Sequence, residues 1–134
     1  MAETTEFELV SPERLLLSEP VEMVVVPGSE GYFGVLPRHA PFIATLAPGV
    51  IDVYEAGKVK ERIFVSGGFA EVTPERCTVL ADEAIKVGEI DTAATEQLIK
   101  DLSEDVAEAK SEPERLNASR QLDVARAKLK AAQH

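Results

Sequence analysis

The feature that most constrains this chain is where its glycines and prolines lie. Up to residue 88 they interrupt the apolar sequence roughly every eight to ten positions, a spacing typical of turns between short strands. From residue 91 to residue 134 there is one proline, Pro113, and no glycine, while Ala, Glu, Lys, Leu and Arg dominate. Those residue types favour helix. The sequence therefore predicts two parts, strands over residues 1–87 and helices over residues 88–134.

Within the first part, apolar and polar residues alternate in short runs. Phe7 and Leu9 share one face of the first run at a period of two. Pro20 and Pro27 are expected to interrupt their runs, because proline has no N–H to donate to a sheet ladder. With no helical segments between the runs, a parallel α/β sheet is excluded. The expected fold class is α+β: an all-antiparallel β-sandwich of about nine or ten strands, followed by a two-helix antiparallel hairpin.

Two stripes of apolar residues at helical spacing define the second part. The first stripe contains Ala94, Leu98, Leu102, Val106 and Ala109, and the second contains Ala118, Leu122, Ala125, Leu129 and Ala132. Between them, Ser111 and Glu114 have the spacing of a helix capping box. We therefore expect an antiparallel hairpin. Because both stripes are rich in alanine, the hairpin buries little apolar area, and its undocked states should lie within a few kcal/mol.

The second expected helix is basic, and Arg115, Arg126 and Lys130 lie along one flank of its apolar stripe. Two interpretations remain open. These side chains form a solvated face paired with acids of the first helix, each pair contributing about 0–1 kcal/mol. Alternatively, they form a cationic surface that leaves the hairpin to bind an acidic partner.

Composition excludes several functions. A net charge of −10 argues against nucleic acid or an anionic lipid surface as the partner. The apolar runs fall far short of the ~20 residues that a membrane-spanning helix needs. Cys77 is the only cysteine, so we expect it buried as a small hydrophobe in a reducing compartment. With no cluster of Cys and His, neither a metal site nor a cofactor is expected. The acids Glu3 and Glu6 near the start do not match a signal peptide.

The stretch from Val25 to Val50 is the richest in chemistry. Three of its glycines, at 28, 31 and 34, follow the pattern G-x-x-G-x-x-G, but without the Lys and Ser/Thr of a phosphate loop. Glu30 and His39 form a candidate acid–base pair, although no third group that would orient them lies nearby in sequence. The other interpretation is a rigid, exposed loop that docks on a partner, with Glu30, Tyr32, Arg38 and His39 on its surface.

The residues GSEGYFGVLPRHAPF, at 28–42, closely resemble the signature loop of the epsilon subunit of bacterial F-type ATP synthases. The segments LAPGVIDV and FVSGGFAEVTPERCTVLADEAI resemble the same family in the same order. The resemblance implies a non-catalytic rotor subunit that joins the gamma subunit to the c-ring and couples proton flow to ATP synthesis. It also implies a peripheral location at the cytoplasmic face of the bacterial inner membrane, with membrane association only through the complex.

The family's ring-contacting loop maps onto this chain residue by residue. The implied c-ring interface is Glu30, Gly31, Tyr32, Phe33, Arg38 and His39. One position departs from the pattern: Tyr32 stands where many relatives have an acid. An aromatic contact, with an apolar body and a hydroxyl tip, is therefore expected in place of a charged one.

The resemblance also concerns the hairpin, which in several relatives opens and inserts toward the alpha/beta catalytic head, inhibiting ATP hydrolysis. It makes Arg115, Arg126 and Lys130 the implied regulatory residues. Some relatives bind ATP through I/L-D-x-x-R-A. Ile90 and Asp91 fit that motif, but Ala94 replaces the arginine that would grip phosphate. We therefore expect weak or no ATP binding and assign no nucleotide-binding residue.

Two alternatives from other functional classes stay open. The first is a stand-alone cytosolic adaptor without catalytic activity, using its hairpin to bind partner helices. The second is a β-sandwich enzyme with Glu30 and His39 as acid and base. A concave polar pocket holding both residues favours the enzyme, and a flat exposed loop does not.

Overall fold

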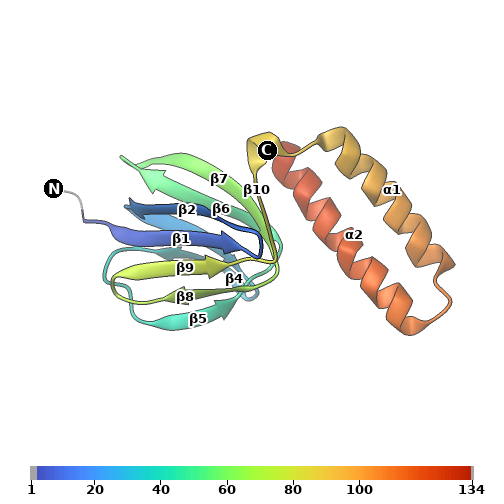
Figure 1. Ribbon diagram of the computed structural model, residues 1–134, viewed down its shortest axis with the longest axis horizontal. Helices are drawn as coiled ribbons and strands as arrows, with labels where there is room; N and C mark the ends of the chain where they lie inside the picture. The colour runs from blue at the N-terminus through green and yellow to red at the C-terminus, as the bar shows by residue number, and fades with distance from the viewer. Residues whose placement is uncertain (1–2, 134) are drawn as a thin grey trace. The chain divides into compact units, whose positions relative to one another are not determined.

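The computed structural model describes residues 3–133 and divides the chain into two compact units, with the boundary between Val87 and Gly88. The first unit is a β-sandwich and the second a helical hairpin (Figure 1). The strands are β1 (Thr5–Ser11), β2 (Arg14–Val21), β3 (Met23–Gly28), β4 (Gly31–Val35), β5 (Phe42–Thr45), β6 (Gly49–Glu55), β7 (Lys58–Ser66), β8 (Phe69–Val72), β9 (Arg76–Leu80) and β10 (Glu83–Lys86).

The described strands form two five-stranded sheets. Sheet A has the order β2-β1-β9-β8-β5, and sheet B has the order β10-β7-β6-β3-β4. The expected sandwich of nine or ten strands is therefore confirmed. One pairing departs from the all-antiparallel expectation: β1 runs parallel to β9, with Phe7 opposite Cys77. Parallel neighbours need a long connection between them. Most of the sandwich sequence lies between β1 and β9. The local alternation of apolar and polar residues therefore could not predict that these two strands pair.

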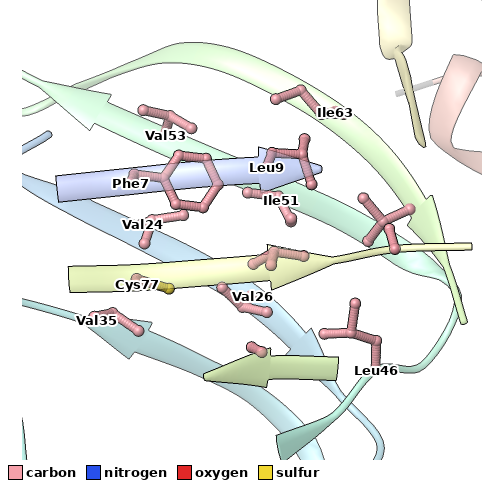
Figure 2. Packing of buried hydrophobic residues seen from close by; sticks show 14 of the residues in the cluster. Phe7, Leu9, Val24, Val26, Val35, Leu46, Ile51, Val53, Ile63 and Cys77 are labelled. Carbon is pink, nitrogen blue, oxygen red and sulfur yellow. The ribbon is translucent and has the colours of Figure 1, made fainter. Parts of the chain in front are cut away.

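The core lies between the two sheets, and in β1 it follows the alternation of the strand. In β1, Phe7 and Leu9 are completely buried while Glu6 is exposed. Figure 2 shows Phe7 and Leu9 together with Val24, Ile51 and Val53 of sheet B in one cluster. Each inward side chain of this kind contributes about 1.5–3 kcal/mol when fully buried. The period of two thus sets which face of β1 turns inward.

Pro20 and Pro27 lie inside strands, so the expectation that they interrupt them is wrong. Pro20 is tolerated because β2 is the edge strand of sheet A, where one side has no ladder to satisfy. The pairing of β3 with β6 ends at Val25, so Pro27 lies outside it. The Pro27 carbonyl still accepts a hydrogen bond, from Ala47 N at 2.9 Å.

The second unit contains α1 (Thr92–Glu108) and α2 (Glu112–Gln133), preceded by a single 3-10 turn, Val87–Glu89. Ser111 Oγ accepts a hydrogen bond from Glu114 N at 3.3 Å, which confirms the expected N-cap. Glu114 Oε2 in turn accepts from Lys110 N at 3.2 Å. The helices meet in a small cluster of Leu102, Leu122 and Ala125, flanked by Ile99 and Val106.

Only part of the expected α1 stripe faces inward: Leu102 is buried and Val106 packs beside it, but the first two positions of the stripe are exposed. Thr95 is buried, whereas Ala94 is exposed and the Leu98 side chain is 45% exposed. The Thr95 hydroxyl donates to the Asp91 carbonyl oxygen at 2.8 Å, which lets this polar residue face inward. Among the described residues, no helix combines the length and apolar character that crossing a bilayer requires.

Candidate docking groove at the β3–β4 tip

The glycine-rich stretch forms a tight hairpin between β3 and β4. Gly28 pairs with Gly31, so Ser29 and Glu30 alone make the turn between β3 and β4. A Cβ atom on Gly28 would lie 2.8 Å from the Gly31 carbonyl oxygen and 3.0 Å from the Phe33 ring. Gly31 has a φ of 129°, which only glycine adopts readily. The glycines therefore allow both the turn and the close approach of Phe33.

This hairpin tip is fastened to the other sheet. Ser29 N donates to the Thr45 carbonyl oxygen at 2.8 Å, at the end of β5. An isolated antiparallel bridge joins Gly28 to Leu46. Because β3 belongs to sheet B and β5 to sheet A, these bonds tie the two sheets together at one corner. The tip is thus held from both sides, which restricts its motion.

A groove of about 550 Å³ opens between this tip and β5. It is lined by Gly28, Ser29, Glu30, Gly31, Tyr32, Phe33, His39, Phe42, Ile43, Ala44 and Thr45. Five of the six residues assigned to the docking surface from the sequence therefore meet here. The sixth, Arg38, does not line the groove.

Aromatic rings form one wall of the groove. The Phe33 and Phe42 ring centroids lie 5.1 Å apart in an edge-to-face arrangement, and those of His39 and Phe42 lie 5.2 Å apart. Both phenylalanines also pack against the core, which fixes their position. Nδ1 of His39 lies 3.0 Å from the carbonyl oxygen of Ala40. The wall is therefore an aromatic surface held by the core, and the His39 ring is its polar part.

Tyr32 lies across the start of β6 with its ring largely in solvent. Tyr32 is 62% exposed, and its hydroxyl oxygen accepts a hydrogen bond from Val50 N at 3.3 Å. The expected aromatic body is thus presented outward. We expected the hydroxyl group to face another protein, but it accepts a hydrogen bond from Val50 N of the same chain.

Arg38 occupies a turn beside the groove. Its backbone adopts a φ of 65°, and its N–H donates to the Pro74 carbonyl oxygen at 2.9 Å. Its guanidinium pairs with Glu3 at 2.7 Å, on the protein surface. An exposed ion pair of this kind contributes about 0–1 kcal/mol. The backbone bond, by contrast, fixes the turn that carries the neighbouring His39.

The sequence interpretation missed Ile43, which is 69% exposed and lines the groove. A signal was available, because in an alternating strand Phe42 and Ala44 share one face and Ile43 lies on the other. The signal was missed because Phe42, Ile43 and Ala44 are all apolar, so the sequence shows no polar residue that would mark the outward face. Ile43 adds an exposed aliphatic side chain to the groove at the edge of sheet A.

The groove brings Glu30 and His39 together, as the enzyme alternative requires. Within residues 3–133, however, no hydrogen bond joins their side chains, and no third side chain orients the His39 ring. A general acid–base pair needs a positioned base and an orienting partner. The groove therefore meets one condition of the enzyme alternative, a shared hollow, and within the described residues it does not meet the other.

The three basic residues to which the sequence assigned a regulatory role, Arg115, Arg126 and Lys130, are all exposed. Arg115 forms a two-bond ion pair with Glu112 on its own helix, at 2.6 Å and 2.9 Å. These bonds raise the pKa of Arg115 and lower the pKa of Glu112. Within residues 3–133, Arg126 and Lys130 form no ion pair. The expected pairing of these residues with the first helix is therefore not found.

The region of the degraded ATP motif serves as a helix cap. Asp91 is the N-cap of α1, and its carboxylate accepts a hydrogen bond from Ala94 N at 3.0 Å. Thr95 is buried and bonded to Asp91, as described above. The motif positions present in this chain thus have a structural role that needs no nucleotide.

Comparisons with known proteins agree over both units. The family model described as "ATP synthase, Delta/Epsilon chain, beta-sandwich domain" matches residues 4–87. A second model, for the C-terminal domain of the ATP synthase epsilon chain, matches residues 91–134. The ATP synthase epsilon chain of Rhodospirillum rubrum is 57% identical over 131 residues, covering 98% of both chains. That of Rhodospirillum centenum is also 57% identical, covering 96% of this chain and 92% of its own.

Solved structures give the same result. A chain of the Euglena gracilis mitochondrial ATP synthase, in a structure of OSCP, F1 and c-ring, matches with a TM-score of 0.83 and 28% identity. The match covers 98% of this chain and 82% of that one. A chain of the Tetrahymena thermophila enzyme matches with a TM-score of 0.65 at 13% identity, over 96% of each chain, and supports the fold alone. With both parts matched and relatives aligned over nearly the full length, this chain belongs to the family of ATP synthase epsilon chains.

Proposed function

We propose that this chain is a non-catalytic rotor subunit of a proton-translocating F-type ATP synthase. In this role residues 1–87 link the gamma subunit to the c-ring and couple proton flow to ATP synthesis. The observation that carries the proposal is the fastened groove at the β3–β4 tip, which presents exposed apolar surface on a rigid support. The related Euglena protein was found in a structure that contains F1 and a c-ring.

The groove is the proposed c-ring face. Glu30, Gly31, Tyr32, Phe33 and His39 contribute to it, and Ile43 extends it. Exposed apolar residues gathered at one place on a folded domain mark an interaction site. Arg38 has an indirect role, since its turn positions His39. The fixed tip favours docking, because a surface that is already ordered loses little entropy on binding.

The absence of an oriented base next to Glu30, within residues 3–133, supports a coupling role without chemistry of its own. Under this proposal the protein lies at the cytoplasmic face of the bacterial inner membrane and reaches the membrane only through the complex. Its partners are the gamma subunit, the c-ring and, through the hairpin, the alpha/beta head.

The hairpin of residues 88–134 is the proposed regulatory part, restraining ATP hydrolysis when α2 leaves α1. Its small apolar cluster supports this role, since few buried contacts hold the helices together. Arg126 and Lys130 form no ion pair within residues 3–133, so no ion pair is broken when they move to an acidic partner. Arg115 would exchange its contact with Glu112 for one on the partner.

Capture of purified c-ring and of gamma subunit by the immobilised full-length protein tests the proposal. We expect the wild-type protein to retain both. Ile43→Asp should lower ring capture about tenfold and leave gamma capture unchanged, because burying an unpaired charge is costly. Val59→Asp is the matched control, since Val59 is also an exposed strand residue but lies outside the groove. If the wild-type protein retains neither partner, the proposal is contradicted and the free adaptor is favoured.

A further inference from the structure

The start of β6 has no strand partner on its β3 side. The ladder between β3 and β6 ends with Val25 opposite Asp52. Two residues further along, the same register would set Pro27 opposite Val50. Pro27 has no N–H to donate, and its carbonyl oxygen accepts a hydrogen bond from Ala47 N at 2.9 Å. The backbone of β3 is therefore engaged elsewhere at this point, and the Val50 N–H needs another acceptor.

The Tyr32 side chain supplies that acceptor. Tyr32 is the neighbour of Pro27 across the β3–β4 hairpin, and its hydroxyl oxygen accepts the hydrogen bond from Val50 N at 3.3 Å. This distance is long for an N–H···O bond, and most of the tyrosine surface is in solvent, so water competes for the same groups. The side chain therefore has two states, one bonded to β6 and one turned into solvent.

One row of sheet B leads from this bond to the strand that precedes the hairpin. Val50 lies opposite Phe64 in β7, and Phe64 lies opposite Ile85 in β10. In an antiparallel ladder, hydrogen-bonded and non-hydrogen-bonded pairs alternate. Because the Val50 N–H points to Tyr32, Val50 and Phe64 are a non-hydrogen-bonded pair, in which the side chains lie closest. The backbone of Phe64 then faces β10.

The far end of this row is weakly supported. Phe64 is completely buried and Val50 nearly so, and densely packed side chains do not shift independently of one another. β10 is a short edge strand whose ladder is to β7. The 3-10 turn Val87–Glu89 follows β10 directly and joins the sandwich to the hairpin. A loosened row is therefore expected to loosen β10 and this joint, because short edge elements open most readily.

We infer that Tyr32 is a positioning residue that couples the β3–β4 tip to the joint between the sandwich and the hairpin. A partner seated on the outward-facing ring favours the bonded state of the tyrosine, and by linkage this stabilises the start of β6 and β10. With the tip unoccupied, the tyrosine leaves β6 more often and β10 opens more often. The c-ring as occupant of the tip rests on the proposed function; the coupling within the chain does not.

Amide hydrogen exchange of the full-length protein tests the coupling without a partner. Tyr32→Phe keeps the ring and removes the hydroxyl. We expect exchange about fivefold faster at Val50, the usual effect of one neutral hydrogen bond, and about threefold faster at Ile85. Tyr54→Phe is the matched control, because Tyr54 lies in the same strand and its hydroxyl forms no hydrogen bond within residues 3–133.

Unchanged exchange at Ile85 in Tyr32→Phe overturns the inference. An equal rise at Val79, in sheet A, also overturns it, because it would show a loss of global stability. The same change in Tyr54→Phe does so too. A double variant tests the row itself: with Phe64→Leu in place, adding Tyr32→Phe should no longer affect Ile85, and an undiminished effect contradicts transmission through the row.

The second experiment separates the inference from the proposed function. Purified c-ring is added at saturating concentration to the wild-type protein and to Tyr32→Phe. Exchange in β10 should slow about threefold in the wild type and stay unchanged in the variant. A ring that binds the wild type without slowing exchange in β10 overturns the inference and leaves the ring-binding function intact. A ring that does not bind contradicts the function, while exchange in the free variants still decides the coupling.

Discussion

The Tyr32 hydroxyl oxygen lies 2.6 Å from the position that a Cβ atom would take on Gly49. The Pro27 Cβ atom lies 2.8 Å from the same position. Gly49 thus allows the tyrosine of the tip to lie across the start of β6 and to accept the hydrogen bond from Val50 N. Tyr32 and Gly49 are far apart in sequence, yet the size of residue 49 decides whether the Tyr32 side chain can take this position.

Gly49→Ala should therefore displace Tyr32 and loosen the groove. We expect a loss of about 1–3 kcal/mol in the free energy of unfolding, which is the usual cost of overpacking. Urea denaturation measures it, and the Tyr32 NMR signals report the displacement. Gly34→Ala is the control, because its Cβ would meet only Met23 Sδ at 3.7 Å. Unchanged Tyr32 signals in Gly49→Ala would show that this contact is unimportant.

The corner between β7 and β8 should be more sensitive still. Gly68 has a φ of 87°, and a Cβ atom there would overlap the Leu80 carbonyl. Gly68→Ala is expected to cost more than about 3 kcal/mol, since backbone strain and a clash with fixed backbone add. Gly57→Ala isolates the backbone part, because Gly57 has a φ of 74° and open space around it. Its expected cost is about 1–2 kcal/mol. Similar costs for the two variants in thermal denaturation contradict this account.

Cys77 should make the sandwich sensitive to high pH. Burial raises the pKa of its thiol to about 12, from an ordinary value of 9.0. A folded-state pKa that is raised gives stability that is fully present below the unfolded pKa and lost as the pH rises toward the folded one. We therefore expect stability to fall between about pH 9 and pH 12, by up to ~1.4 kcal/mol per pH unit.

Cys77→Ala tests this expectation by removing the titrating group. The variant should be less stable at pH 7, because it leaves a small cavity, yet lose less stability than wild type as the pH rises from about 8 to about 11. Parallel pH profiles of the free energy of unfolding for the two proteins would refute the assignment. The comparison cancels other groups that titrate in this range, such as Lys60.

Removing residues 88–134 should leave a folded sandwich that still assembles with the rotor. The sandwich is a compact unit with its own core, and it contains the groove. ATPase activity of the head complex should rise or stay unchanged when the truncated protein replaces the full-length one. A truncation that abolishes coupled ATP synthesis would contradict the proposed division of roles.

The hairpin should bind ATP weakly or not at all. Ala94 is an exposed alanine where the motif of some relatives has the phosphate-binding arginine, and Asp91 serves as the cap of α1. Isothermal titration of the full-length protein with ATP measures this directly. Micromolar affinity would show that another arrangement of the hairpin supplies the missing contacts.

Much of the fold was predictable because it depends on local patterns. Alternation identified the strands and the inward side of β1, and the Ser111–Glu114 spacing located the start of α2. The parallel pairing of β1 with β9 was not predictable, since it joins strands that are far apart in sequence. The place of Pro20 within a strand was hidden for the same reason: only the sheet order shows that its strand is an edge.

The candidate site was predictable in kind but not in detail. Glycines, an acid and aromatics indicated an exposed tip, and five of the six assigned residues line one groove. The turn that places Arg38 outside the groove is held by the hydrogen bond from its N–H to the Pro74 carbonyl oxygen, a long-range contact that pattern analysis does not reach. Likewise, adjacent alanine and threonine leave the first turn of α1 ambiguous, and the packing of Ile99 and Leu102 against α2 brings Thr95 inward.

The corner that joins Gly28 to Leu46 has a mechanical consequence. A sideways load on the tip pulls on the Ser29–Thr45 bond and on the β3–β4 ladder at the same time, so both sheets resist it in parallel. Bonds loaded together must fail together, whereas a free hairpin would peel open one bond at a time. The tip is therefore held against sideways displacement by both sheets, more firmly than a hairpin joined to one sheet alone.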